Sequence, residues 1–223
     1  MEDTVHPNEL KAWGTEFQAL DDNVRHLVAI SAMASASRPA PIADIAQRRL
    51  SQLEHLSEKT LFVQQTREAI LKMTGLMGMP RTIHAMASLM SVIGPDSDLA
   101  MEIAKIPTMR NRANYDYEQM RARGQAQFNC VYGSQAMEVH EEVRGLYPEL
   151  AEVAIVDLYG RLLSENRYLS GRDTELCIIG ALVPQNAPVQ LNNHCKGAVN
   201  LGATKEMVQA ALRLAKIACT KKL

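Results

Sequence analysis

The segment from Asp173 to Val183 would be apolar on nearly every side if it formed a helix. Its apolar residues are Leu176, Cys177, Ile178, Ile179, Ala181, Leu182 and Val183. A helix that is hydrophobic all round belongs in the centre of a bundle, because no face of it suits water. The rest of the 223-residue chain, which has the length of one large domain or two small ones, must therefore surround this segment.

Apolar residues recur with helical spacing along most of the chain, and Gly or Pro marks the places where this spacing stops. Aromatic residues make up only 4% of the chain, while Ala, Leu and Met are frequent, which favours helix over sheet. No stretch alternates as a strand would. The sequence therefore predicts an all-α fold, with further helices over residues 21–36, 42–53, 57–75, 81–92, 134–143, 148–163, 188–201 and 204–218.

Two segments share the order helix, Gly-containing turn, amphipathic helix. The first is 69–89, with Gly78-Met-Pro at its turn, and the second is 197–214, with Gly202-Ala-Thr. Helical hairpins are common, so coincidence stays open beside an internal repeat. The repeat hypothesis divides the chain into an N-terminal arm (1–20), a degenerate first helical repeat (21–95), connecting helices (96–142), a second repeat (143–219) and a tail (220–223).

The charge balance and the apolar pattern exclude several classes of protein. The chain has 24 Lys and Arg against 25 Asp and Glu, without the basic excess of a nucleic-acid-binding protein. It has no apolar run of about 18 residues, so we expect no membrane span. The acidic start, Met1-Glu-Asp-Thr4, predicts no signal peptide. We therefore expect a cytoplasmic protein with reduced thiols.

The common motifs for metals and cofactors are absent. The six histidines include no H-x-x-x-H pair and the four cysteines no C-x-x-C, so we expect no metal and no cofactor. Glycine-rich nucleotide-binding motifs are also missing. The stretch 95–133 is more polar and less regular. Its arginines are Arg110, Arg112, Arg121 and Arg123. They are consistent with a solvated helical face or a connecting arm, and the alternative is that they bind an anion.

One group of polar residues stands out in the apolar C-terminal third. Glu175 lies near the start of the apolar helix, and Gln190 and His194, four residues apart, share one face of the next helix. We expect these side chains to meet where the two helices pack. A buried Glu tends toward a raised pKa, and a His can then exchange protons with it or with a ligand. The alternative is an exposed first-turn Glu175 and a core His194 with satisfied hydrogen bonds.

The order of motifs around these residues resembles the carboxymuconolactone decarboxylase family, whose superfamily also contains the AhpD-like alkylhydroperoxidases. The resemblance covers about 60–219, and the segment from His194 to Gly202-Ala-Thr is its most specific part. Some segments resemble the longer fungal members with two repeats. The segments that carry the resemblance are 66–72, 78–81, 123–125, 131–133, 147–150, 157–160, 172–176, 188–194, 197–198 and 202–208.

The resemblance implies an AhpD-like helical bundle that forms homo-oligomers, with its site at a junction of helices. It implies that His194 and Glu175 transfer protons and that Gln190 and Arg172 bind the substrate by holding an oxyanion. Tyr159 is a further possible donor, or else a packing residue. The first repeat looks like a structural copy, because the position equivalent to His194 falls near Ile70.

We therefore expect a cofactor-independent decarboxylase, lyase or isomerase acting on a small carboxylated or enolisable metabolite. One alternative is an AhpD-like oxidoreductase using Cys195 or Cys177. Against it, the two C-x-x-C positions hold Ala187 and Gln190, which cannot be oxidised. The other alternative is a non-catalytic ligand-binding or structural oligomer.

The last residues suggest a second location. Lys221-Lys-Leu223 partly matches the peroxisomal address S-K-L, and the resembling family includes peroxisomal fungal members. The alternative interpretation is that these residues end the last helix, where the positive charge of the lysines interacts favourably with the helix dipole.

Overall fold

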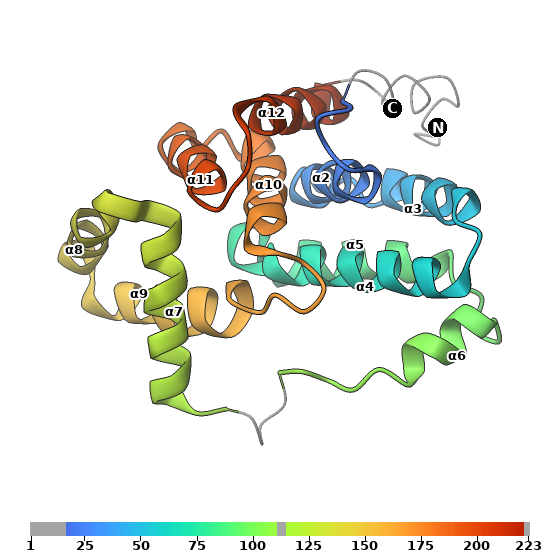
Figure 1. Cartoon of the computed structure of the whole chain (residues 1–223), viewed down its shortest axis with the longest axis horizontal. Coiled ribbons are helices and arrows are strands. Elements are labelled where there is room, and N and C mark those ends of the chain that lie inside the picture. The colour runs from blue at the N-terminus through green and yellow to red at the C-terminus, as the bar shows by residue number, and fades with distance from the viewer. Residues whose placement is uncertain (1–16, 111–114, 221–223) are drawn as a thin grey trace.

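The structure, a computed structural model, describes residues 17–110 and 115–220. That part of the chain consists of helices and loops and contains no strand, which confirms the all-α class (Figure 1). Arg112, most of the predicted N-terminal arm and the Lys-Lys-Leu tail lie outside the described residues. The elements are α2 (Asp22–Ser35), α3 (Ala40–Gln52), α4 (Leu56–Lys72), α5 (Thr74–Ser91), α6 (Asp98–Ala104), α7 (Tyr117–Tyr132), η2 (Gly133–Gln135), α8 (Ala136–Leu146), α9 (Pro148–Val153), η3 (Ala154–Leu163), α10 (Gly171–Leu182), η4 (Val183–Gln185), α11 (Pro188–Asn200) and α12 (Lys205–Thr220).

Helix α10 lies at the centre of the molecule, as its apolar sequence predicts (Figure 1). It packs against α2, α11 and α12, and every residue from Thr174 to Leu182 is buried. Its N-cap is Ser170, whose hydroxyl accepts a hydrogen bond from the Asp173 backbone N–H at 3.1 Å. A buried, capped helix of this kind gives the polar side chains it carries a fixed position.

The middle of the chain is more regular than the sequence predicts. Within 95–133 the structure contains α6 and the 16-residue helix α7, where we expected a less regular stretch. Helix α7 buries Met120, Gly124, Phe128 and Val131, which follow a spacing of about one turn. This buried stripe is narrower than that of a core helix and lies among exposed polar residues. The polar composition of the segment therefore hid the helix from sequence analysis.

Each of the two turns of the repeat hypothesis contains a glycine with a positive φ. Helix α5 begins at Thr74, earlier than expected, and is kinked at Gly78, where φ is 77°. Gly202, between α11 and α12, has a φ of 95°. Both values lie in the left-handed region that favours glycine. Gly133, which belongs to neither turn, also has a positive φ, so this feature is not specific to a repeat and two related halves stay a prediction.

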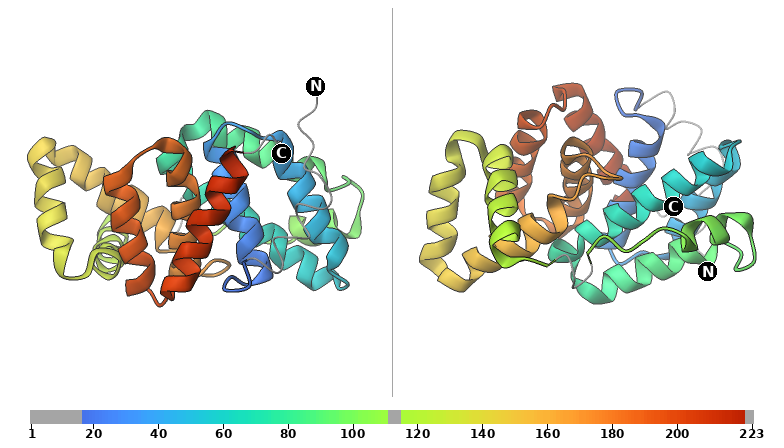
Figure 2. Two further views of the ribbon diagram at one scale, coloured as in Figure 1. Left: turned by 90° about the horizontal axis from the view of Figure 1, so that it is seen from above. Right: turned by 60° about the horizontal axis from the view of Figure 1, so that its bottom comes forward.

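The segment α7–α8–α9 forms one end of the molecule (Figure 2). Helix α9 continues into η3, a π-helical stretch in which the Ser164 backbone N–H donates to Tyr159 O at 2.9 Å. Several large apolar side chains on α8 and α9, or between them, are exposed, and a homo-oligomer, which stays a prediction, would need such a surface. They are Met137, Leu146, Tyr147, Leu150 and Val153.

Helix α7 and η3 cross with their backbones in unusually close contact. A Cβ atom built on Gly124 would lie 1.9 Å from Ile155 O, and one built on Gly160 would lie 2.1 Å from Met120 O. No real Cβ approaches an oxygen so closely. The two glycines therefore allow the crossing that holds η3, and with it Tyr159, in place.

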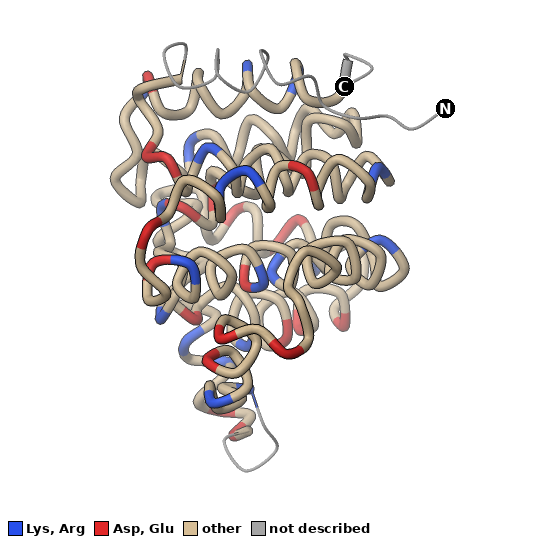
Figure 3. The backbone as a smooth tube through the Cα atoms, turned by 90° about the vertical axis from the view of Figure 1, so that its right-hand side faces the viewer, with Lys and Arg blue, Asp and Glu red and all other residues tan. Residues whose placement is uncertain are grey.

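Acidic and basic residues are mixed along the described chain, and neither sign collects on one part of it (Figure 3). None of the helices in residues 17–110 and 115–220 has both the length and the apolar composition that crossing a bilayer requires.

Arg110 does not lie on a solvated face, but it lines a pocket of about 440 Å³ with Arg123, Arg161 and Arg167, so contact to an anion stays a prediction. Its guanidinium donates two hydrogen bonds to Glu68, both at 2.8 Å, and this ion pair is largely buried. It also donates to the carbonyls of Arg161 and Leu162 at the end of η3. Arg110 thus ties α4 to η3, a role that its place in a polar stretch did not indicate.

Candidate active site

His194 and Glu175 form a buried hydrogen-bonded pair between α11 and α10. His194 Nδ1 lies 2.7 Å from Glu175 Oε2, and the two residues are 7% and 1% exposed. Glu175 is therefore not an exposed first-turn residue. When the carboxylate accepts the proton on Nδ1, a neutral imidazole carries its lone pair on Nε2. Nε2 has no hydrogen-bond partner among the described residues, so it is the atom left to act on a ligand.

The residue next to Glu175 on α10 fixes a second buried polar group. Thr174 Oγ1 accepts a hydrogen bond from Lys72 Nζ at 2.8 Å, and Leu169 O accepts another at 3.2 Å. Lys72 is the last residue of α4 and is 2% exposed. Burial lowers the pKa of Lys72 to about 8. Thr174 therefore binds Lys72, and the next residue of α10, Glu175, binds His194. Both bound groups are titratable and come from distant parts of the chain.

Lys72 and His194 line one cavity of about 170 Å³. Its wall is mostly apolar and comes from α4, α5, α7, η3, α10 and α11. The lining residues are Lys72, Gly75, Leu76, Tyr132, Leu158, Tyr159, Leu162, Leu163, Ile178 and His194. An apolar cavity with a few converging polar groups is the usual form of a small-molecule site. This volume is comparable to that of an apolar cavity of about 150 Å³ that holds benzene.

The two tyrosines of the cavity belong to an aromatic cluster. Tyr159 donates a hydrogen bond from its hydroxyl to that of Tyr132 at 3.3 Å, and its ring packs edge-on against Phe128. The Tyr132 ring centroid lies 6.2 Å from that of His194. Burial raises the pKa of Tyr159 well above its ordinary value, so its hydroxyl stays protonated. Tyr159 thus packs and holds the hydroxyl of Tyr132, whose own O–H stays free among the described residues at the cavity wall, while a direct donor role for Tyr159 stays a prediction.

Gln190 and Arg172, the other two predicted site residues, lie away from this pair. Gln190 is exposed, one turn before His194 on α11, and no described contact joins it to His194 or Glu175. Arg172 donates from Nε to Asp173 Oδ1 at 2.8 Å, and its Nη2 lies 3.5 Å from Asp21 Oδ2. A substrate-binding role for Gln190 and Arg172 stays a prediction, without a contact in the structure that supports it.

Sequence reasoning did not assign a role to Lys72 or Tyr132. Both lie in segments quoted for the family resemblance, 66–72 and 131–133, but far from His194 in the sequence. For Lys72 one signal was available, because it ends a helix next to apolar residues such as Ile70, Leu71 and Met73. A lysine in such surroundings is either at the rim of the core or inside it, and only the packing of α4 on α10 decides which.

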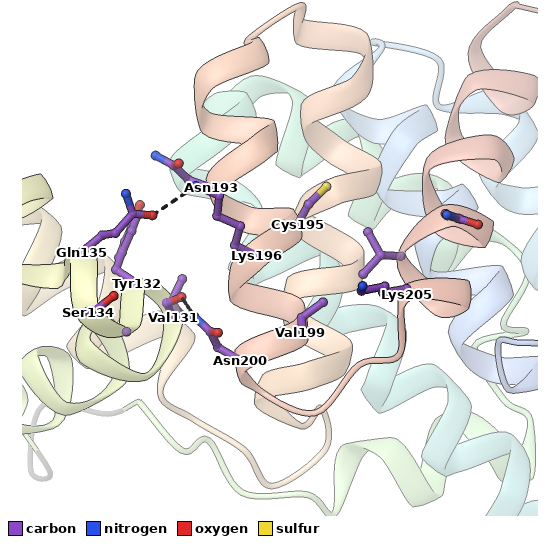
Figure 4. A pocket seen from close by; sticks show the side chains of 13 residues that line it. Val131, Tyr132, Ser134, Gln135, Asn193, Cys195, Lys196, Val199, Asn200 and Lys205 are labelled. Carbon is purple, nitrogen blue, oxygen red and sulfur yellow. Dashed lines mark hydrogen bonds between the residues drawn. The ribbon is translucent and has the colours of Figure 1, made fainter.

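A larger pocket of about 570 Å³ lies around α11, between the α7–η2 junction and α12 (Figure 4). Gln135 accepts a hydrogen bond from Lys196 across it, and Asn200 donates to Val131 O. His194 and Lys72 line the smaller cavity and not this pocket, whereas Tyr132 lines both. We place the candidate site in the smaller cavity because the buried acid–base groups are there.

The thiols do not resemble a redox pair. Cys177 is fully buried, and burial raises its pKa to about 12. Burial, together with the charge of Glu175, also raises the pKa of Cys195. Both pKa shifts lower the fraction of each cysteine in the thiolate form, which peroxide chemistry requires. Within residues 17–110 and 115–220, no three His, Cys, Asp or Glu side chains gather as the ligands of a metal would.

Comparison with known proteins places these residues in a family. The model of the carboxymuconolactone decarboxylase family matches residues 148–221, the part that carries Glu175 and His194. "Peroxisomal protein 2" of Schizosaccharomyces pombe is 34% identical over 190 residues, which are 85% of this chain and 83% of that protein. "Peroxisomal protein 2" of Saccharomyces cerevisiae is 30% identical over 187 residues, 73% of this chain and 64% of that protein. The chain therefore belongs to the carboxymuconolactone decarboxylase family, together with these fungal relatives.

Proposed function

We propose that this protein is a cofactor-independent enzyme, a decarboxylase, lyase or isomerase, whose substrate is a small carboxylated or enolisable metabolite bound in the 170 Å³ cavity. The observation that carries the proposal is the His194–Glu175 pair, buried at 2.7 Å beside that cavity. A carboxylate that accepts from one imidazole nitrogen orients the other as a general base and stabilises the imidazolium that forms.

The pair suits a proton transfer to or from carbon. A base at Nε2 of His194 removes a proton beside a carbonyl or returns one after carboxylate loss. Because Tyr159 donates its single O–H to Tyr132, the free O–H in the cavity belongs to Tyr132, which would donate a hydrogen bond to a developing oxyanion. The apolar wall strengthens both effects, because charges interact more strongly where water is excluded. The AhpD-like alternative has less support, because it needs thiolates and burial raises the pKa of Cys177 and Cys195.

Turnover of a panel of small 3-oxo acids and carboxylated lactones in D₂O tests this proposal. Proton NMR would follow both loss of the carboxylate and deuterium incorporation at carbon. We expect His194→Ala to lower the rate about 100-fold, because a positioned acid–base group contributes at least that much. Glu175→Gln should lower it less, since an amide can still accept from Nδ1.

Cys195→Ser is the matched control for that experiment. Cys195 follows His194 on α11 and does not line the small cavity, so its loss should leave turnover unchanged. Circular dichroism must show the same helical signal for all variants. Equal turnover by wild type and His194→Ala would contradict the proposal. In a separate assay with a peroxide and a thiol reductant, peroxide reduction that needs Cys195 but not His194 would favour the oxidoreductase.

We also propose that the protein is located in peroxisomes, because both fungal relatives bear the name "Peroxisomal protein 2". A fluorescent protein fused ahead of the intact chain should coincide with a peroxisomal marker in a fungal cell. Replacing Leu223 by Glu should make the signal diffuse if the last three residues are the address. A diffuse signal from the intact chain contradicts the proposal, and a peroxisomal signal from the variant places the address elsewhere.

A further inference from the structure

Lys72 is an unusual residue to find in the wall of a small apolar cavity. Lysine is almost never fully buried unless a carboxylate pairs with it, yet Lys72 is 2% exposed. Its hydrogen-bond partners are both neutral: the carbonyl of Leu169 and the hydroxyl of Thr174. Among the described residues no carboxylate lies within ion-pair distance of its nitrogen.

The nearest candidate for a counter-ion is already engaged. Glu68 lies one turn before Lys72 on α4, but both of its oxygens accept hydrogen bonds from Arg110 at 2.8 Å. An ammonium group without a partner in a desolvated place is costly, whereas a neutral amine is not. The surroundings of Lys72 therefore increase the fraction of its neutral form, which can act as a nucleophile, over that of an exposed lysine.

The two hydrogen bonds also orient the amine. A neutral amine has two N–H groups and one lone pair. With the N–H groups donated to Leu169 O and Thr174 Oγ1, the lone pair takes the remaining direction on the nitrogen. Because Lys72 lines the cavity together with His194 and Tyr132, a molecule bound there meets a nucleophile, a base and a hydroxyl donor in one small space.

We propose that Lys72 forms an imine with a carbonyl compound bound in the cavity, a proposal that rests on the proposed function and names its substrate class as small 3-oxo acids. The lone pair of Nζ adds to the carbonyl carbon, and the C=O electron pair moves to the oxygen. That oxygen takes up two protons and leaves as water, while the nitrogen loses one. The sum is amine plus carbonyl plus one proton giving iminium plus water, and no oxidant or reductant takes part.

The iminium supplies what a decarboxylation needs. When the bond to the neighbouring carboxylate breaks, its electron pair moves toward the positively charged nitrogen, and CO₂ and an enamine result. His194, with Glu175 behind it, then delivers a proton to the carbon. Addition of water to the iminium releases the ketone and restores Lys72. The cavity volume suits an acid of roughly six heavy atoms, by comparison with the cavity that holds benzene.

Reductive trapping tests the proposal directly. The intact protein would be incubated at neutral pH with acetoacetate, or separately with acetone, in the presence of sodium cyanoborohydride, and the adduct located by peptide mass spectrometry. We expect an adduct at Lys72 to form at least about tenfold faster than at Lys196, because the neutral fraction of an amine grows tenfold per unit of lowered pKa. No excess at Lys72 with either compound would overturn the proposal.

The rate of trapping should fall as the pH is lowered below about 8, as Lys72 becomes protonated. The charges of Glu68, Arg110, Cys177 and Glu165 contribute to this profile. The other titratable groups near Lys72 are Tyr132, Tyr159 and His194, which line the same cavity, and Glu175, which is bonded to His194. A pH profile at Lys72 identical to that at Lys196 would count against a buried nucleophile.

Lys72→Met must lose the adduct, and Lys196→Met, a change on exposed α11 surface, must keep it. If Lys72→Met fails to fold, Lys72→Arg keeps a donor for Leu169 O and Thr174 Oγ1 but cannot form an imine. His194→Ala separates this proposal from the proposed function. An adduct at Lys72 in both wild type and His194→Ala supports the imine, even if His194 proves unnecessary for turnover. Turnover that depends on His194 without labelling of Lys72 overturns the imine and leaves the proposed function standing.

Discussion

Gly124→Ala should destabilise the protein by about 3 kcal/mol or more, at the upper end of what overpacking costs. The new methyl group would lie 1.9 Å from the carbonyl oxygen of Ile155, so α7 and η3 must move apart. Gly160→Ala meets the carbonyl of Met120 at 2.1 Å from the opposite side of the same crossing and should cost a similar amount. Backbone atoms cannot rotate away as a side chain can, so neither site relaxes cheaply.

Urea unfolding measures this effect, and Gly145→Ala is its matched control. Gly145 lies in α8, and the methyl group of an alanine there would have no atom within 4 Å. Alanine at this position should therefore stabilise the protein by about 0.5–1 kcal/mol. If Gly124→Ala unfolds at the same urea concentration as the wild type, the close crossing of α7 and η3 is wrong. Since η3 carries four residues of the cavity wall, that result would also displace the candidate site.

The stability of the protein should depend on pH through Lys72. Its pKa is about 8 in the folded protein against an ordinary value of 10.5. Below pH 8 both folded and unfolded chains carry the proton, and burial of the charge weakens the fold. Between pH 8 and 10.5 only the unfolded chain keeps it, so the free energy of unfolding rises with pH by about 3 kcal/mol in total.

The difference between Lys72→Met and the wild type isolates this dependence. Methionine leaves Leu169 O and Thr174 Oγ1 without a donor, which costs a constant amount at every pH. The free energy of unfolding of Lys72→Met, minus that of the wild type, should therefore fall by about 3 kcal/mol between pH 7.5 and 10.5. Lys196→Met, which removes an exposed lysine, is the matched control. A flat difference for Lys72→Met would mean that its ammonium is solvated.

The sequence was informative where one helix carries the whole signal. The apolar run of 173–183 placed α10 at the centre, and the order of Glu175 and His194 on two packed helices brought that pair together. The last helix was expected from residue 204, and the Thr204 hydroxyl accepts from the Met207 N–H at 3.2 Å at the start of α12. Such features depend on neighbouring residues, so local spacing is enough to find them.

Features that depend on distant packing were not visible. Lys72 and Thr174 lie 102 residues apart, and nothing in either segment specifies the contact. The apolar residues of 154–163 fit an α-helix as well as the wider π-helix, because both periods place residues four or five apart on one face. Gln190 shares a helix with His194, but one turn is enough to move it from the buried junction to the surface.

The adjacency of Thr174 and Glu175 limits how this site can change. Lys72 and His194 are hydrogen-bonded by consecutive residues of a rigid, buried helix. Any shift of α10 therefore moves Thr174 and Glu175 together. A new substrate cannot be accommodated by adjusting one group at a time. Divergence among related proteins should instead concentrate on Leu158 and Leu162, which are half-buried on η3 and line the cavity without holding any polar group. The chemistry would then be inherited with α10, and the choice of substrate would evolve on the opposite wall.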